Sequence, residues 1–294
     1  MTPRQRQDRD DTDESTDEPN DGRPSDSTDG PAGAASGRAL DVRLDAEALA
    51  TALDGAMAVA SECRMAFDDG LVFRARDPAD VAMVEMRLDG EAFDRYAADG
   101  ETFGVALDRL RDAVAMADGD GIELALGEGG RFDVNAGAVE YAFAPLAAES
   151  VRRVEWIDAG PADANAVIAA ADLRRAVRAA GLVADHAVVT VDPSDRLLAV
   201  TASGDTDDVR LEFGEDDLEA LDPGPGDSDP VESLYSVDYL RDIVGAIPDG
   251  VPVSAEFVGA ARAGARSRWN IPSRTATGRA GGCWRRGSGG ENET

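Results

Sequence analysis

The stretch "LDRLRDAV" at residues 107–114 returns as "VDYLRDIV" at residues 237–244, an offset of 130 residues. A second pair supports the first, because "DPADVAMVEM" at 77–86 is matched more loosely by "DTDDVRLEF" at 205–213, an offset of 128. Two separated segments displaced by nearly the same distance indicate two copies of one structural unit, rather than two unrelated helices that look alike.

Both copies show the same order of local patterns. Each begins with a helical apolar pattern, continues through short strands that alternate apolar and polar residues, and reaches its second helix before the last strands. Short strands joined by tight turns, with two helices to each copy, are typical of helices packed on one face of antiparallel sheets. The sequence therefore predicts an α+β fold built from two duplicated domains.

The composition of the 294 residues limits the classes of protein that fit. The formal net charge is −30, all 29 basic residues are arginine, and 43% of the residues are hydrophobic. A surface this acidic is tolerated best in concentrated salt, because the Debye length falls to about 3 Å at about 1 M and self-repulsion is screened. The sequence shows neither a long apolar run nor a basic and apolar leader, so we expect a cytoplasmic protein.

Residues that could carry chemistry are few and scattered. Cys63 and Cys283 are too few for a disulfide framework or a zinc site, and a buried thiol plus a stray one explains them. His186 is the only histidine, and no cysteine or serine is placed to form a catalytic triad with it. The acidic clusters at 192–195 and 204–208 lack the spacing of a calcium loop and are more simply turns. We therefore predict no enzyme activity, no metal and no cofactor.

Composition also divides the chain into segments. Residues 1–38 hold acids, arginines and small residues without a single Val, Ile, Leu or aromatic side chain, which predicts a disordered acidic tail. The two copies occupy residues 39–144 and 164–258, with a connector between them at 145–163. Residues 259–294 reverse the charge, with seven arginines against two glutamates, and need an explanation of their own.

Five stretches of the middle region resemble the archaeal DNA polymerase sliding clamp family, PCNA, and its salt-adapted members in particular. They are, in chain order, "RARDPADVAMVEM" (74–86), "FGVALDRL" (103–110), "GLVADH" (181–186), "SGDTDDV" (203–209) and "SLYSVDYLRDIVGAIP" (233–248). They follow the order and spacing of the family, and such a set is more specific than any single motif. The resemblance implies a homotrimeric ring that encircles duplex DNA without reading its sequence.

The same resemblance implies the partners of such a ring. They are the replicative DNA polymerase, the clamp loader, a nuclease and a ligase, each bound through a clamp-binding peptide, and no membrane. The alternative from another class is an acidic adaptor that keeps the duplicated fold but no longer encircles DNA, or binds partners poorly. A mass measurement separates the two functions, because a ring requires a closed trimer.

Arginines on the helix faces are the candidate contacts to DNA phosphates. On the two repeated helices and on the helix at 172–180, the apolar stripe faces the core and the arginines flank or oppose it. These residues are Arg109, Arg111, Arg174, Arg175, Arg178 and Arg241. Arginines in such places also serve as simple solubilising charge, and it is the resemblance that favours DNA contact.

The resemblance also implies two protein-binding surfaces. A hydrophobic pocket for partner peptides falls at Val81, Met83 and Leu146, although the residues alone favour ordinary strand core for Val81 and Met83. The subunit interface falls on the strands at 139–144 and 208–213, whose pairing would cover two edges that are otherwise exposed. The contact residues on these strands are Tyr141, Phe143, Val209 and Leu211.

The end of the chain departs from the family pattern. After "VPVSAEF" at 251–257 the family continues with two more strands, and neither pattern is present here. If the last base of each codon is read with the first two of the next, "RWNI" (268–271) becomes Leu/Val/Met-Glu-Tyr/His and "GCWRR" (282–286) becomes Leu/Val/Met-Leu-Ala-Pro. Both rereadings match the family, so we predict a frameshifted C-terminus. The second domain would then lack its last two strands, and residues 259–294 would form an aberrant, disordered basic tail.

Overall fold

The computed structural model describes most of the chain from residue 40 onward. The described ranges are 40–80, 82–117, 119, 121–155, 161–224, 229–258, 266–271 and 277–283. The chain divides into two units, Met1–Gly37 and Arg38–Thr294, and every described residue lies in the second unit. The segment 1–38, for which we predict disorder, lies outside the described residues.

The elements of each copy begin with a strand, β1 or β10, and not with the predicted helix; a first helix, a run of strands and a second helix then follow as predicted. Those of the first copy and the connector are β1 (Leu40–Asp45), α1 (Ala46–Met57), β2 (Glu62–Phe67), β3 (Leu71–Arg76), β4 (Ala82–Leu88), η1 (Gly90–Ala92), β5 (Phe93–Ala98), β6 (Thr102–Ala106), α2 (Leu107–Ala115), β7 (Gly121–Leu126), η2 (Glu128–Gly130), β8 (Phe132–Ala136), β9 (Val139–Phe143) and η3 (Ala148–Ser150). Those of the second copy are β10 (Ala164–Ala169), α3 (Ala170–Ala180), β11 (His186–Asp192), β12 (Leu197–Ser203), β13 (Asp208–Phe213), η4 (Glu215–Asp217), β14 (Ala220–Asp222), β15 (Val231–Ser236), α4 (Val237–Gly245), β16 (Pro252–Val258), β17 (Arg266–Ile271) and β18 (Thr277–Cys283).

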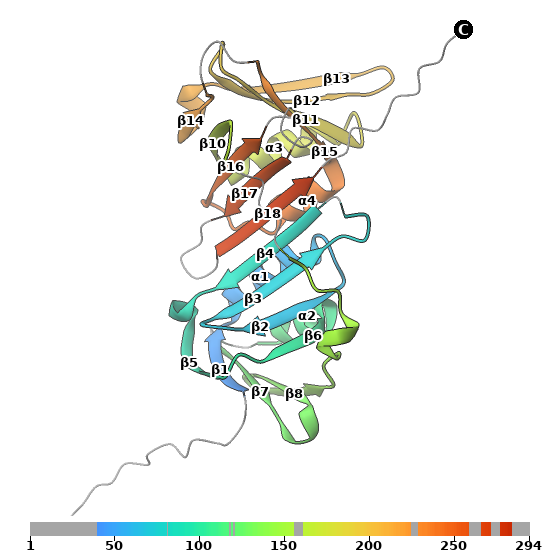
Figure 1. Cartoon of the computed structure of the whole chain (residues 1–294), viewed down its shortest axis with the longest axis vertical. Coiled ribbons are helices and arrows are strands. Elements are labelled where there is room, and N and C mark those ends of the chain that lie inside the picture. The colour runs from blue at the N-terminus through green and yellow to red at the C-terminus, as the bar shows by residue number, and fades with distance from the viewer. Residues whose placement is uncertain are drawn as a thin grey trace, which may run out of the picture. The chain divides into compact units, whose positions relative to one another are not determined.

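The two copies repeat one strand order, which confirms the predicted duplication (Figure 1). In the first copy, β5-β1-β7-β8-β9 form a five-stranded sheet, and β4-β3-β2-β6 lie side by side as a second set. In the second copy, β14-β10-β16-β17-β18 and β13-β12-β11-β15 repeat these two sets in the same order. Neighbouring strands pair antiparallel throughout these sets, so the predicted α+β fold is confirmed.

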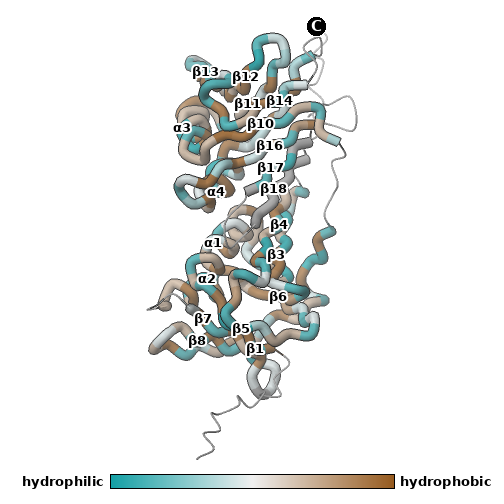
Figure 2. Tube along the Cα trace, turned by 90° about the vertical axis from the view of Figure 1, so that its left-hand side faces the viewer, coloured by the Kyte–Doolittle hydropathy of each residue, from teal (hydrophilic) through white to brown (hydrophobic). Residues whose placement is uncertain are grey.

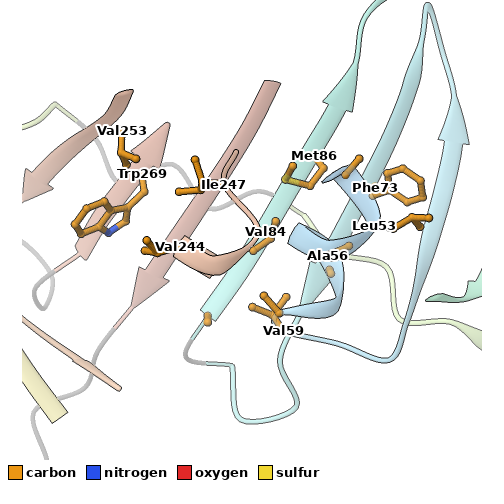
Figure 3. Packing of buried hydrophobic residues seen from close by; sticks show 14 of the residues in the cluster. Leu53, Ala56, Val59, Phe73, Val84, Met86, Val244, Ile247, Val253 and Trp269 are labelled. Carbon is orange, nitrogen blue, oxygen red and sulfur yellow. The ribbon is translucent and has the colours of Figure 1, made fainter. Parts of the chain in front are cut away.

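One strand pairing joins the two copies. β18 pairs antiparallel with β4, so that β14-β10-β16-β17-β18 and β4-β3-β2-β6 become a continuous nine-stranded sheet. The main hydrophobic cluster also spans the junction, since it includes Val84 and Met86 of β4 together with Val244 of α4 and Ile247 just after it (Figure 3). The two copies therefore share one sheet and one core.

The four α-helices of the described residues lie on one side of the nine-stranded sheet (Figure 2). α1 begins after Asp45, whose carboxylate accepts a hydrogen bond from the Ala48 backbone N–H at 2.6 Å and caps the helix. The buried stripe of α1 returns in α3, where Leu173 takes the place of Leu49. None of these helices is long and apolar enough to cross a membrane.

The prediction that the second domain lacks its last two strands is wrong. β17 and β18 form inside the segment 259–294, which we expected to be a disordered tail. β18 is rich in glycine, but main-chain N–H and C=O groups make the ladder, and β18 has a partner strand on each side. The other residues of the segment lie outside the described ranges, and its origin in a frameshift stays a prediction.

β17 forms because its residues alternate between core and surface. Trp269 is 5% exposed, and the centroid of its ring system lies 5.8 Å from the rings of both Tyr235 and Phe257. Next to it in sequence, Arg268 faces the other side of the sheet and its Nη1 donates to Glu256 Oε2 at 2.9 Å. A large buried ring and a paired surface charge are enough to fix the register of this strand.

Candidate nucleic-acid and protein interfaces

The first helix pair holds one of its arginines against an acid. Arg111 of α2 reaches α1, where its Nε donates to Asp54 Oδ1 at 2.6 Å and its Nη2 donates to Oδ2 at 3.2 Å. The hydrogen bond to Asp54 raises the pKa of the Arg111 guanidinium. Arg109 on the same helix is exposed, and it forms no ion pair with the residues that the structure describes.

We expected Arg174 of α3 to project from its helix toward DNA, but its guanidinium is held by groups at and just after the end of α4. Its Nη1 donates to the backbone carbonyls of Ile247 at 2.7 Å and Val244 at 3.3 Å, and its Nη2 pairs with Asp249. The Ile247 carbonyl lies just after α4, and the Val244 carbonyl at the end of α4 also accepts from the Ile247 N–H, so Arg174 adds hydrogen bonds where the helix ladder stops. Its guanidinium joins α3 to α4 and is not free for a phosphate.

The other arginines of the second helix pair remain at the surface. Arg175 pairs with Asp172 at 3.1 Å and Arg241 pairs with Asp238 at 2.6 Å, each within one turn of its own helix. Exposed pairs of this kind contribute about 0–1 kcal/mol, so another anion can replace the acid. Arg178 is exposed and has no ion-pair partner in the described ranges.

The repeat places Arg178 and Arg241 where the first copy has Asp54 and Arg111. α1 and α3 align at an offset of 124 residues and α2 and α4 at 130, which matches their buried stripes. Arg241 lies against the end of α3, because its Nη2 is 2.8 Å from the point where a Cβ on Gly181 would stand. Two arginines therefore replace an acid and an arginine at this place in the second copy.

The strands predicted to form the subunit interface are outer strands of their sheets. β9 ends the five-stranded sheet and β13 ends the four-stranded sheet, as arranged in the described residues. On β9, Tyr141 and Phe143 share one face with ring centroids 5.6 Å apart, while Glu140 is exposed. On β13, Val209 and Leu211 are half-buried against the core. Each strand thus combines an outer backbone edge with an apolar face.

The connector crosses the face of the nine-stranded sheet that is opposite the helices. Near its start, Leu146 forms an isolated antiparallel bridge with Gly104 of β6. Farther along, the Val151 carbonyl accepts a hydrogen bond from Arg64 Nε at 3.0 Å, and Arg152 Nη1 lies 2.6 Å from an Asp80 carboxylate oxygen. Arg64 alternates with buried residues of β2, which places the connector on the outer face.

The predicted partner pocket is only partly assembled. Met83 of β4 is 6% exposed and alternates with core residues, whereas Leu146 is half-buried beside β6. β4 and β6 are three strand positions apart, roughly 14 Å at normal strand spacing, so Met83 and Leu146 are not in contact. Val81 lies outside the described residues. Sequence reasoning missed two buried connector residues, Val151 and Val154, whose spacing in "VRRV" was the available signal.

The residues considered for chemistry sit in ordinary surroundings. Burial raises the pKa of the Cys63 thiol to about 12, so the thiol is protonated and unreactive at neutral pH. His186 is exposed at the start of β11. Within the described ranges, no three His, Cys, Asp or Glu side chains are grouped so that they could hold a metal ion.

A duplicated α+β chain, with paired helices on one side, an outer strand in each copy and a connector across the other side, has the architecture of DNA clamps. The DNA polymerase sliding clamp of Natronomonas pharaonis is 40% identical over 217 residues, which are 73% of this chain and 86% of the relative. The clamp of Haloarcula marismortui is 41% identical over the same shares. No protein-family model matches the chain.

Solved structures give the same result for the fold. PCNA of A. fulgidus, solved with the C-terminal region of FEN-1 bound, matches with a TM-score of 0.75 and 26% identity over 85% of this chain and 100% of that one. PCNA of Thermococcus kodakaraensis matches with a TM-score of 0.72 and 24% identity over 84% of this chain. The chain belongs to the DNA polymerase sliding clamp family, which confirms the resemblance seen in the five stretches.

Proposed function

We propose that three copies of this chain close into a ring around duplex DNA in the cytoplasm, and tether the replicative polymerase and other replication and repair proteins to it. The observation that supports ring closure is the junction of β18 with β4 inside the chain. It joins the last strand of a five-stranded set to the first strand of a four-stranded set. β9 is the strand of the first copy that is equivalent to β18, and β13 is the strand of the second copy that is equivalent to β4. Both β9 and β13 are outer strands.

The register of the internal junction supplies a register for the junction between subunits. Ala280 of β18 lies opposite Val84 of β4. When the strand pairings of the two copies are aligned, Tyr141 of β9 is equivalent to Ala280 of β18, and Val209 of β13 is equivalent to Val84 of β4. Tyr141 of one copy is then opposite Val209 of the next, which brings two half-buried apolar side chains together.

The same register makes a charge pair. Arg279 is opposite Glu85 inside the chain, and the equivalent residues between subunits are Glu140 and Arg210. Opposite charges on facing strands contribute about 0.2–1 kcal/mol, and like charges there are destabilising. The interface register can therefore be tested by exchanging the two charges.

Light scattering and native mass measurement test the ring. In molar salt the chain should be a trimer, and Arg210→Glu should raise the dissociation constant by about two- to fivefold. Adding Glu140→Arg should restore the trimer, whereas adding Glu232→Arg on β15 should not. The effect should grow as salt is lowered, because screening falls. A monomer at every concentration contradicts ring closure, and failure of the exchange contradicts this register.

For DNA, we propose that the second helix pair makes the main contacts. Arg178 and Arg241 come from two neighbouring helices, and neither is held by the backbone as Arg174 is. Two such guanidinia suit one phosphate, and phosphate contacts carry no sequence information. The attraction is weak and falls with salt, which a closed ring tolerates because the ring is retained by topology.

Processivity of a clamp-dependent polymerase tests these contacts. Arg178→Glu with Arg241→Glu should shorten the product length severalfold, because two attractive contacts become repulsive. Arg153→Glu with Arg196→Glu makes the same change of net charge on the connector and on the turn after β11, and should have little effect. Equal loss in both double variants would contradict a special role for the second helix pair.

For partners, we propose that peptides from the polymerase, clamp loader, nuclease and ligase dock on the outer face beside the connector. The buried Met83 and Val154 support an apolar pocket there. The probe is a synthetic peptide of the C-terminal region of A. fulgidus FEN-1, measured by calorimetry. Met83→Ala should weaken its binding about tenfold, as loss of a central apolar contact does. Leu234→Ala, at an exposed apolar residue of β15, is the control. Equal peptide affinity of the wild type, Met83→Ala and Leu234→Ala would contradict a docking site at Met83.

A further inference from the structure

One carboxylate in the first copy is buried and fully engaged. Asp77, directly after β3, has no exposed surface. Its Oδ2 accepts from the Ala79 N–H at 2.8 Å, and its Oδ1 accepts from the Ala82 N–H at 2.7 Å. A buried carboxylate is tolerated only when hydrogen bonds replace its water, and these two bonds fix the course of the turn between β3 and β4.

A residue of the second copy provides a third donor. The Tyr239 hydroxyl, on α4, donates to Asp77 Oδ2 at 3.0 Å across 162 residues of sequence. Burial, together with the bond to this carboxylate, raises the pKa of Tyr239, so the hydroxyl keeps its proton at neutral pH. The repeat gives Arg109 as the equivalent residue of α2, and Arg109 is exposed. The contact is therefore a special feature of α4 and not a consequence of the duplicated fold.

The opposite side of the same turn is held by the connector. Asp80 has a left-handed backbone with φ of 63°. Its carboxylate lies 2.6 Å from Arg152 Nη1 and 3.1 Å from Arg76 Nε. The hydrogen bond from Arg152 is the main cause that lowers the pKa of Asp80. One short turn thus contacts α4 through Asp77 and the connector through Asp80.

We propose that Tyr239 is a positioning residue for the partner-docking surface, which holds the β3–β4 turn in the conformation that the connector and a docked peptide require. The inference rests on the proposed function, because it concerns the same outer face. Tyr239 does not touch the peptide in this account. It acts through Asp77, and thereby links a helix on the DNA-facing side to the turn on the side where partners dock.

The test is Tyr239→Phe, which removes one hydroxyl and keeps the ring. Tyr96→Phe is the matched control, because the Tyr96 hydroxyl donates to the Gly70 carbonyl at 3.0 Å, away from the turn. In Tyr239→Phe, the amides of Ala79 and Ala82 should exchange with solvent about three- to tenfold faster, and the FEN-1 peptide should bind about three- to tenfold more weakly. Tyr96→Phe should change neither quantity.

The results separate a positioning role from a loss of stability. Unchanged peptide affinity in Tyr239→Phe overturns the proposal, even if the variant unfolds more easily. Equal weakening in both variants overturns it as well, because the effect would then follow stability alone. If the wild-type chain does not bind the peptide, the docking function itself fails, and amide exchange at Ala79 and Ala82 still decides whether Tyr239 holds the turn.

Discussion

The two copies keep one apolar pattern but join their helices in opposite directions. In the first copy, Arg111 of the second helix reaches back to Asp54 of the first helix. In the second copy, Arg174 of the first helix reaches forward to the carbonyls at the end of the second helix. Every buried residue of α3 has a buried equivalent in α1 at an offset of 124 residues. Duplication has therefore preserved what the core requires, while contacts at the rim of the core have diverged.

The surfaces of the two helix pairs have also diverged, and they differ in charge. α1 and α2 carry two arginines and four acids, and their formal charge is −2. α3 and α4 carry four arginines and three acids, and their formal charge is +1. In a chain with a net charge of −30, this small positive excess supports the proposal that the second helix pair makes the main contacts to DNA.

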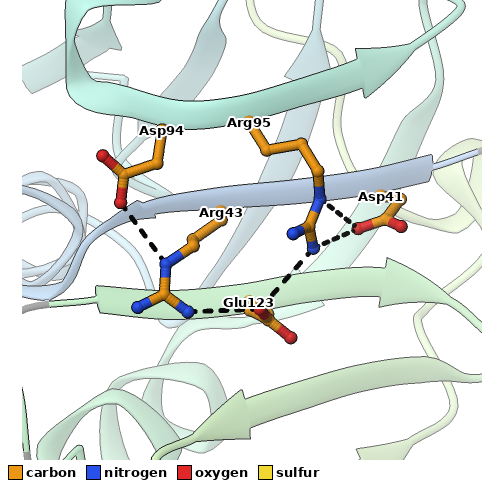
Figure 4. Close-up of polar contacts among 5 residues, drawn as sticks. All are labelled: Asp41, Arg43, Asp94, Arg95 and Glu123. Carbon is orange, nitrogen blue, oxygen red and sulfur yellow. Dashed lines mark hydrogen bonds and ion pairs between the residues drawn. The ribbon is translucent and has the colours of Figure 1, made fainter. Parts of the chain in front are cut away.

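The outer faces of the sheets also differ between the two copies, in the number of charged side chains on equivalent strands. In the first copy, β1, β5 and β7 carry an ion-pair network in which Arg95 contacts Asp41 and Glu123, and Arg43 contacts Asp94 and Glu123 (Figure 4). The equivalent positions of β1 and β7 in the second copy hold uncharged residues, which are Asn165, Val167 and Ser254. The ion-pair network across β1, β5 and β7 is therefore a feature of the first copy that these positions of the second copy do not repeat.

The largest contrast in stability is expected at the fourth strand of each five-stranded set. Trp269→Ala in β17 should lower the free energy of unfolding by about 3–5 kcal/mol, because a buried ring is lost. Val134→Ala, at the equivalent place in β8, should cost about 2 kcal/mol, since it removes two carbon atoms. Denaturant unfolding in molar salt measures both. If Trp269→Ala left the free energy of unfolding unchanged, the prediction of a disordered C-terminal tail would be favoured over a packed β17.

The helix contacts should differ by less. Arg174→Ala should cost about 1–3 kcal/mol, because it removes the hydrogen bonds that the guanidinium donates to the Ile247 and Val244 carbonyls. Arg111→Ala should cost about 0–1 kcal/mol, because its partner Asp54 is 41% exposed and is solvated when the pair is lost. The same unfolding experiment compares them. If Arg111→Ala proved the more costly change, the first helix pair would depend more on its arginine than the second.

How far the sequence could predict these features depends on where a residue's partner lies. The repeat and the α+β class were predictable, because the recurring segments and the periods of 2 and 3.6 that core burial imposes are visible in the residues themselves. The outer strands were predicted only through the resemblance to the sliding clamp family. The role of Arg174 was not, because a helical pattern gives the direction of a side chain but not carbonyls seventy residues later. β17 was missed because we looked for the family's residues, while "SRWN" already alternates around Trp269.

A smaller effect should follow from converting one copy into the other. Arg178→Asp places an aspartate beside Arg241, as Asp54 lies beside Arg111 in the first copy. The free energy of unfolding should change by about 0.5 kcal/mol or less, since both groups are at the surface. A double-mutant cycle with Arg241→Ala isolates the pair. A coupling energy near zero would show that the two second-copy positions are farther apart than the repeat implies.

The smallest effect concerns acid. The hydrogen bonds to Arg152 and Arg196 lower the pKa of Asp80 and of Glu215 below their usual values of 3.8 and 4.5. Each pair therefore stabilises the folded chain at pH values above the usual pKa, and this contribution disappears as the pH falls through the lowered pKa. Asp80→Asn and Glu215→Gln should differ from the wild type above about pH 5 and converge with it in stronger acid. A difference that persists in strong acid would point to a cause other than charge.

The β18–β4 pairing has a consequence for synthesis on the ribosome. β4 emerges early, but the strand that covers its edge is translated only after almost all of the second copy. During that interval the first copy exposes an unpaired edge beside the buried side chains of Val84 and Met86. Pairing so distant in sequence is slow to form. A nascent clamp is therefore open to premature association with its neighbours on a polysome until its final strands are released.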